Sequence, residues 1–230
     1  MMARRCAFRM LFASIAALAL AACGSSDTIR YKMIVEVDTP EGLKTGVAVR
    51  EVRYTKPSSL PSIGESRPQW RIKGEAVAVD LPGGRTLFAL LRSEAREDFG
   101  GREVWSILKQ SDEDEVELWP STPKTGRPQV FDPKPMLVHF KNIDEPDTVE
   151  RVDPNAAGAA LGTGYRLRRI IVSRTSESVT SGINQRLRWL QTVRRQRGSL
   201  RLHVPRYLDE SSPIHLVSTS DFTTELSNES

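Results

Sequence analysis

The first 23 residues combine a short apolar run with basic residues in front of it. Arg4, Arg5 and Arg9 precede the apolar run, which extends from residue 10 to residue 22. A basic segment, about 7–15 apolar residues and small residues before a cleavage point are typical of a secretory signal. A transmembrane helix needs about 20 apolar residues, and this run is shorter. The pattern therefore predicts an export signal that is removed.

The apolar run ends in the tetrapeptide LAAC, which resembles a bacterial lipobox and closes at Cys23. In such a motif, cleavage precedes the cysteine, whose thiol and new amino group are acylated. Two or more chains are needed for stable anchoring, because each buried CH2 contributes only about 0.8 kcal/mol. We therefore expect residues 1–22 to be a signal peptide, Cys23 to be lipidated and residues 23–28 to be a polar tether. Gly24 is not the Asp that this resemblance associates with the inner membrane, so we expect the outer membrane, facing the periplasm.

Beyond the tether, apolar and polar residues alternate in a way that predicts a β-hairpin. Residues 29–38 have a period of two, which is typical of a strand with one buried face. A turn at residues 40–42 leads into a return strand over residues 47–54. Apolar residues change phase along the return strand, so we expect a β-bulge near Arg50 and Glu51.

A second hairpin is predicted between residues 70 and 91. Apolar residues alternate from Trp70 to Leu81, and the turn at residues 82–84 is rich in Pro and Gly. The run from Leu87 to Leu91 is continuously apolar, which predicts a strand covered on both faces. Further short strands are expected at residues 104–108, 136–140 and 165–172.

The predicted helices are short, and two segments are expected to be loops. Asp153 followed by Pro154 predicts a helix over residues 154–161. Thr180 is expected to cap a helix over residues 180–190, whose apolar residues recur at helical spacing. The acidic run at residues 112–117 and the Pro-rich stretch at residues 119–135 have the composition of loops.

These patterns predict a mainly β fold with a minority of helix. Antiparallel hairpins of this kind form a sheet, a sandwich or a small barrel, decorated by a few short helices. Removal of the signal leaves 208 residues, enough for one sizeable core. We expect a single β-rich domain over residues 29–208 and a polar, partly disordered tail over residues 209–230. The Pro-rich stretch at residues 119–135 is the boundary if the chain has two domains.

Charge is balanced in total but unevenly placed. The net charge of +4 falls to +1 without the three signal arginines, because 30 basic residues then face 29 acidic ones. Residues 92–150 contain 8 basic and 14 acidic residues, whereas residues 151–208 contain 12 basic and 2 acidic residues. The two segments can pair with each other, or the basic one can face an anionic partner.

Arginines of the basic segment form the candidate binding site. Guanidinium groups bind phosphates and carboxylates bidentately, and aromatic residues such as Trp189 can stack beside the ligand. The expected partners are another envelope protein or an anionic envelope component, and export argues against nucleic acid. The alternative is a solvated face neutralised by the acidic run. The candidate residues are Arg186, Arg188, Arg194, Arg195, Arg197 and Arg201.

The sequence contains no motif for catalysis, a metal or a cofactor. His139, His203 and His215 have no second ligand at metal-binding spacing, and HExxH and GxSxG are absent. His139 is expected on the surface of a strand. The acidic run lacks the central Gly of a calcium loop. The mature chain has no thiol pair, so neither a disulfide nor a Cys-based zinc site is expected. A hydrolase built around His139 or His215 remains the alternative from another class.

The second half of the chain carries a recognisable pattern of residues. It consists of the strand at Met136, then Asn142, Asp144, Pro146, Val152-Asp153-Pro154, Gly162, Gly164, Val179 to Ile183, Arg186-Leu187 and Trp189-Leu190. Together with the two hairpins, this pattern resembles the small uncharacterised lipoproteins of proteobacteria. The resemblance implies the envelope location and no activity. The sequence thus favours a lipid-anchored binding module, with a purely structural surface lipoprotein as a further alternative.

Overall fold

A computed structural model describes six ranges of the chain: residues 26–56, 67–93, 99–120, 134–196, 198–201 and 216–225. The predicted signal, Cys23, Arg197, His203 and His215 lie outside these ranges. Of Arg201, only the backbone is described. The chain divides into two compact units, one of residues 1–27 and 54–69 and the other of residues 28–53 and 70–230. All sites discussed below belong to the larger unit.

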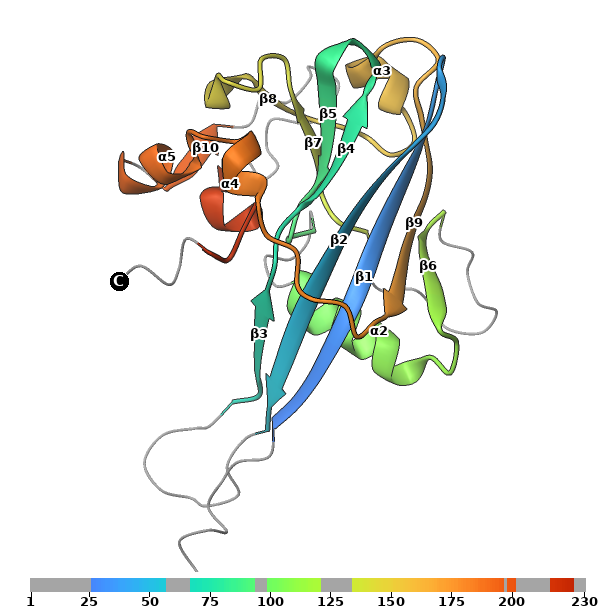
Figure 1. Cartoon of the computed structure of the whole chain (residues 1–230), viewed down its shortest axis with the longest axis vertical. Coiled ribbons are helices and arrows are strands. Elements are labelled where there is room, and N and C mark those ends of the chain that lie inside the picture. The colour runs from blue at the N-terminus through green and yellow to red at the C-terminus, as the bar shows by residue number, and fades with distance from the viewer. Residues whose placement is uncertain are drawn as a thin grey trace, which may run out of the picture. The chain divides into compact units, whose positions relative to one another are not determined.

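The mainly β fold is confirmed, with antiparallel sheets and few short helices. One sheet has five strands in the order β3-β2-β1-β9-β6 (Figure 1). β1 already begins at Ser26, so residues 26–28 of the expected tether are strand. The predicted hairpin of β1 and β2 is confirmed. The strands of the five-stranded sheet are β1 (Ser26–Thr39), β2 (Gly42–Thr55), β3 (Gln69–Lys73), β6 (Glu115–Trp119) and β9 (Arg166–Arg174).

β2 keeps one phase along its length, so the bulge predicted near Arg50 and Glu51 is wrong. Gly46, Ala48, Arg50 and Val52 are all buried at every second position. Arg50 thus occupies a core position where the sequence pattern predicted a bulge. Apolar spacing alone is misleading here, because a long polar side chain takes an inward position.

The other large sheet has four antiparallel strands in the order β4-β5-β7-β8. Leu87 of β5 packs in one core and Phe88 in another, which confirms that this strand is covered on both faces. The predicted second hairpin is only partly right, since its first strand divides at Gly74 into β3 and β4 of different sheets. The strands are β4 (Val77–Leu81), β5 (Arg85–Ala89), β7 (Leu137–Phe140) and β8 (Val149–Arg151).

The first hydrophobic core lies between the two large sheets and includes helix α2 (Val104–Gln110). The sequence predicted a strand at residues 104–108, which is wrong. Val104 and Leu108 are both buried at the i, i+4 spacing of one helix face. A π-helical turn, Phe99–Glu103, leads into α2. Five residues are too few for their periodicity to distinguish a buried strand from a buried helix.

The second hydrophobic core lies on the opposite face of the four-stranded sheet. It is built around ring contacts among Phe88, Phe140, Trp189 and Phe222, with centroids 5.4–6.0 Å apart. Such edge-to-face pairs add stability beyond the area that they bury. The elements packed here are α4 (Ile183–Arg186), α5 (Leu190–Gln196), β10 (Ser199–Arg201), β11 (Leu216–Ser218) and a 3-10 turn (Thr219–Asp221).

The helix predicted over residues 180–190 is two helices. Thr180 does not cap it but binds Val49 of β2: its amide donates to the Val49 carbonyl at 3.1 Å, and its Oγ1 accepts a hydrogen bond from the Val49 amide at 3.1 Å. The chain then turns at Gly182 into α4, and a second break at Leu187 precedes α5. Leu187 and Leu190 are nevertheless buried, as the spacing predicts.

Asp153 does not begin a helix at residue 154, as the sequence predicts. Its carboxylate accepts a hydrogen bond from the amide of Asn155 at 2.9 Å, which closes a turn. Helix α3 (Ala157–Leu161) begins only after this turn and stops at Gly162. A 3-10 turn, Pro146–Thr148, precedes β8.

Part of the predicted C-terminal tail belongs to the fold. Phe222 is fully buried in the second core, and the amide of Ala76 donates to its carbonyl oxygen at 2.7 Å. Asp221 is buried and lies 3.4 Å from the guanidinium of Arg92. A composition rich in Ser and Thr therefore concealed a packed segment at residues 216–225.

His139 is buried, with 4 % of its surface exposed, so its predicted surface position is wrong. β7 lies in the middle of its sheet, and both of its faces are covered. His139 Nε2 lies 3.3 Å from the carboxylate of Glu150, which also pairs with Lys141. Burial lowers the pKa of His139, while the Glu150 carboxylate opposes this shift.

We expect His139→Gln to alter the pH dependence of stability. The unfolded histidine binds a proton near pH 6.5, whereas the buried one does so at a lower pH. The unfolded state therefore binds more protons below about pH 6.5, and the native protein loses stability as the pH falls, by at most about 1.4 kcal/mol per pH unit. The measurement is urea unfolding of both proteins from pH 7.5 to 5. Parallel stability curves would contradict the assignment.

Candidate functional site

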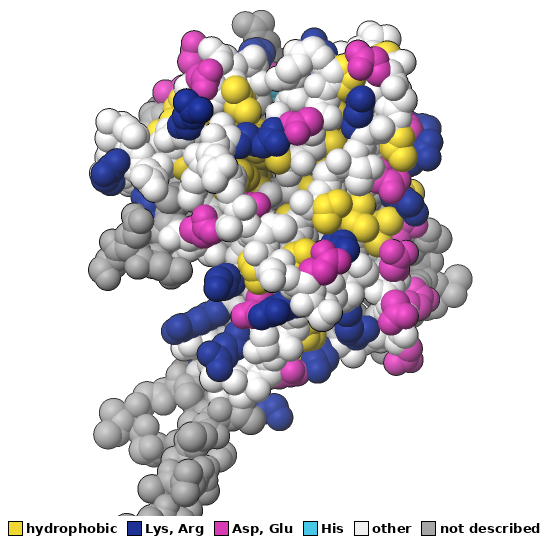
Figure 2. Space-filling model, in the orientation of Figure 1, with side chains coloured by type: hydrophobic (Ala, Val, Ile, Leu, Met, Phe, Trp, Pro, Cys, Tyr) yellow, Lys and Arg dark blue, Asp and Glu magenta, His cyan; other side chains and the backbone are white. Residues whose placement is uncertain are grey.

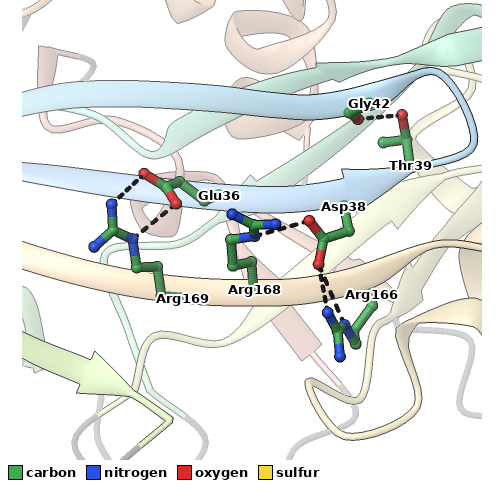
Figure 3. Close-up of polar contacts among 7 residues, drawn as sticks. All are labelled: Glu36, Asp38, Thr39, Gly42, Arg166, Arg168 and Arg169. Carbon is green, nitrogen blue, oxygen red and sulfur yellow. Dashed lines mark hydrogen bonds and ion pairs between the residues drawn. The ribbon is translucent and has the colours of Figure 1, made fainter.

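The described arginines of the basic segment include a set with carboxylate partners and a set that forms no ion pair among the described residues. The paired set lies on β9, where the register against β1 shifts between Glu36 and Val37. Leu167 and Ile170 are both buried although they are three residues apart. The extra residue at this bulge turns both Arg168 and Arg169 to the outer face, beside Arg166 (Figure 3).

Two carboxylates of β1 neutralise these arginines. Arg169 binds Glu36 bidentately, with N–O distances of 2.7 and 2.9 Å. Arg166 and Arg168 share the carboxylate of Asp38, at 2.9 and 2.8 Å. The hydrogen bond from Arg169 lowers the pKa of Glu36, and that from Arg166 lowers the pKa of Asp38.

The acidic run supplies further negative charge to the same face. Its second half is not a loop, as predicted, but strand β6, which pairs with β9. Val116 and Leu118 pack into the first core, so Glu115 and Glu117 face outward. The hydrogen bond to Glu36 is the main cause that raises the pKa of Arg169, and the charges of Glu117 and Glu115 add to this shift. Strand pairing of β6 with β9 thus brings two acidic side chains of the acidic segment near Arg169, whose ion-pair partner is Glu36 of β1.

The predicted site residue Arg186 also has an acidic partner. Its guanidinium binds both carboxylate oxygens of Asp80 on β4, with Nη2 3.0 Å from Oδ2. A bidentate contact of this kind engages the face of the guanidinium that would meet a ligand. Arg186 therefore joins α4 to the four-stranded sheet through an exposed ion pair, and its charge has a counter-charge within the fold.

The unpaired set consists of Arg188, Arg194 and Arg195. Arg188 lies in the turn before α5, and the other two lie in its last turn. Arg188 and Arg195 are exposed, and Arg194 is half-buried. Within the six described ranges, none of the three forms an ion pair. Cationic side chains in the last turn of a helix also complement its dipole, but that effect amounts to only about 0.3–1 kcal/mol.

A second basic surface was missed by the sequence reading. It is formed by side chains on the outer face of β1, β2 and β3, where Arg71 and Lys73 alternate with the inward Trp70 and Ile72. Figure 2 shows Lys and Arg gathered over the lower half of these strands, and Asp and Glu at the other edge of the sheet. The alternation of basic and apolar residues is visible in the sequence, but the basic residues are spread over three strands. The basic residues of this surface are Arg30, Lys32, Arg53, Arg71 and Lys73.

The described residues contain no cluster of three or more His, Cys, Asp or Glu that could hold a metal ion. In those residues, no helix has the length and apolar character needed to cross a bilayer. No protein family model, no curated protein and no solved structure matches the chain.

Proposed function

We propose that the protein is a lipid-anchored lipoprotein of the bacterial cell envelope, related to the small proteobacterial lipoproteins that its sequence resembles. Its β-rich domain acts as a binding module, performs no chemistry and stands at the periplasmic face of the outer membrane. The partner is another envelope protein or an anionic envelope component. The contact is made by Arg188, Arg194 and Arg195.

The observation that carries this proposal is the contrast between the two sets of arginines. The β9 arginines and Arg186 have carboxylate partners within the fold. The three arginines around α5 have none among the described residues, although the chain has almost as many acidic as basic side chains. Guanidinium groups that lack an internal counter-charge are available for carboxylates or phosphates of a partner.

The burial of His139 reduces the case for a hydrolase centred on that residue. A general base must come within about 3 Å of the proton that it removes. His139 lies on a central strand with both faces covered. The purely structural alternative predicts that no partner binds, and the same experiment tests it.

The proposal is tested by Arg194→Glu combined with Arg195→Glu, in the lipidated protein at native abundance. In-cell cross-linking and mass spectrometry first identify the attached partner. Each charge-assisted hydrogen bond contributes about 1.5–3 kcal/mol, so the double variant is expected to reduce cross-linking more than tenfold. High salt is expected to weaken the contact as well.

The matched control is Arg71→Glu combined with Lys73→Glu, which changes the net charge by the same amount on a different surface. Cross-linking that depends equally on both pairs would show a general charge effect. An unchanged yield in the α5 variant, or no partner for correctly anchored protein, would contradict the proposal.

A further inference from the structure

We propose that two glutamates, Glu75 and Glu225, form a pH-sensitive latch for the C-terminal segment, residues 216–225. Uptake of a proton by Glu75 strengthens the docking of this segment on the domain, and loss of the proton weakens it. Glu75 lies two residues after β3, and Glu225 ends the segment. The latch does not depend on the partner proposed for the arginines around α5.

The C-terminal segment is held at the bend between β3 and β4. The amide of Thr224 donates a hydrogen bond to the carbonyl oxygen of Gly74 at 3.0 Å. Next to this bond, Glu75 and Thr223 form an antiparallel β-bridge. Phe222, one residue earlier, is fully buried in the second core. Docking of the segment therefore closes that core, and Glu75 lies in the docking contact itself.

The two carboxylates of the latch meet at the start of α4. One oxygen of Glu75 accepts a hydrogen bond from the amide of Ile183 at 2.8 Å. The next residue, Asn184, donates its side-chain amide to the carboxylate of Glu225 at 3.2 Å. Because the two donors are on consecutive residues, the two negative charges lie close together. Glu75 is half-buried, so solvent screens their repulsion less than it would on an open surface.

No cation forms an ion pair with either carboxylate among the described residues. The charges that act on Glu75 are those of Glu225 and of Arg50 on β2. Arg50 binds the backbone carbonyl oxygen of Glu75, through Nε at 2.9 Å, and two other acceptors in the core. The other charged groups on the elements packed here have partners of their own, Arg186 with Asp80 and Asp221 with Arg92.

The same place has a surplus of hydrogen-bond acceptors. Asn184 Oδ1 is buried and has no donor within the described ranges. An ionised carboxylate only accepts hydrogen bonds, whereas a protonated one also donates. A proton from solvent on Glu75 therefore removes one of two like charges and adds a donor where acceptors are in excess.

The direction of the response follows from the pKa of Glu75. Burial raises this pKa above its ordinary value of 4.5, the hydrogen bond from Ile183 opposes the shift, and the charge of Glu225 adds to it. The docked state therefore binds a proton at a higher pH than the undocked state does. Docking becomes more favourable as the pH falls through the docked pKa, and the gain is complete below about pH 4.5.

His139 provides a response of opposite sign within the same domain. Its pKa is lowered by burial, so acid weakens the whole domain, while it strengthens the docking of the C-terminal segment. A local measurement at the docking contact, compared with a reference elsewhere in the fold, separates the two effects.

The test is amide hydrogen exchange of the full chain, followed by NMR between pH 7.5 and 4.5 and corrected for the intrinsic exchange rate. The reporters are the amides of Ala76 and Thr224, which donate across the docking contact to Phe222 and Gly74. Amides in the pairing of β1 with β9 are the reference for opening of the domain as a whole. Protection of a reporter measures how rarely its own part of the fold opens.

We expect reporter protection, relative to the reference, to rise about twofold or more as the pH falls, because each pKa unit changes the docking equilibrium about tenfold. Glu75→Gln retains an oxygen for Ile183 but lacks the charge, so its protection should be high and independent of pH. Glu225→Gln should reduce the rise. The matched control is Glu177→Gln, at a glutamate that pairs with Lys32, and it should leave the rise unchanged.

Two results would overturn the latch. One is reporter protection that stays constant, relative to the reference, between pH 7.5 and 4.5 in the unaltered protein. The other is a rise in Glu75→Gln equal to that of the unaltered protein, which would assign the response to another group.

Discussion

Replacing Arg50 with Met is expected to lower the free energy of unfolding by about 3 kcal/mol, because one buried and one part-buried carbonyl group would lose a hydrogen-bond donor. Arg50 has none of its surface exposed. Its Nε donates to the carbonyl of Glu75 at 2.9 Å, and its Nη2 donates to that of Ala89 at 3.0 Å. Through these bonds, β2 is joined to the bend after β3 and to the end of β5.

Two opposing terms decide the size of this effect. Removing a buried charge relieves a desolvation cost, which favours the variant. Each carbonyl left without a donor costs about 1–3 kcal/mol, which opposes it. Arg50 also contacts the sulfur of Met33 at 3.4 Å and partly offsets the burial that raises the pKa of Tyr31. We expect the loss of several contacts across two sheets to outweigh the relief.

Arg50→Lys distinguishes the hydrogen bonds from the charge. Lysine retains the charge, but a single ammonium cannot reach carbonyls on two separate elements as a guanidinium fork does. It is therefore expected to be no more stable than the Met variant. Arg53→Met, on the exposed face of the same strand, is the control and should change stability by about 0.5 kcal/mol or less. Urea unfolding of the full chain measures all three. A loss below about 1 kcal/mol in Arg50→Met would contradict this role.

Gly46→Ala is expected to cost about 3 kcal/mol, at the upper end for overpacking of a core. A Cβ at this position of β2 would collide with the carbonyl oxygen of Ala78 on β4. It would also lie 2.8 Å from the Val79 side chain. Backbone of the second sheet must move to relieve the clash, and a flexible side chain cannot absorb it. Gly46 thus permits the close approach of the two sheets.

Gly101→Ala is the matched control for Gly46. A Cβ at Gly101 would lie 3.6 Å from Cβ of Trp70, which is an ordinary contact. Alanine is also about 1 kcal/mol better than glycine in a helical segment, so stability should be unchanged or slightly higher. Thermal and urea unfolding of both variants measure these changes in stability. Equal effects at the two positions would show that the contact with Ala78 is not tight.

Most strands were predictable because alternation is a local property of the chain. The hairpin of β1 and β2, the doubly buried β5 and the strands β7 and β9 all lie where the pattern indicated. α2 could not be distinguished from a strand, because a run of five apolar and polar residues fits either period. The break at Gly74 was also hidden, since both halves alternate in the same way while they join different sheets.

In the candidate site, too, some features were predictable from the sequence and others were not. The sequence identified the basic segment and left open whether it pairs with the acidic segment or faces a partner. Only the structure separated Arg166, Arg168 and Arg169, which pair with β1, from the arginines of α5. The partners of the paired set are about 130 residues away in the chain, so no local pattern could reveal them.

The sequence by itself determined the strand pattern, the predominance of β structure and the expectation of an anchored envelope protein. The tertiary structure decided which polar residues are buried and which charges are left without a partner. Arg50 and His139 illustrate the reason. A strand has two faces, and its sequence shows which residues share a face but not what covers it. The elements that cover each face come from distant parts of the chain. They decide whether Arg50 and His139 are buried and which charged side chains have no partner within the fold.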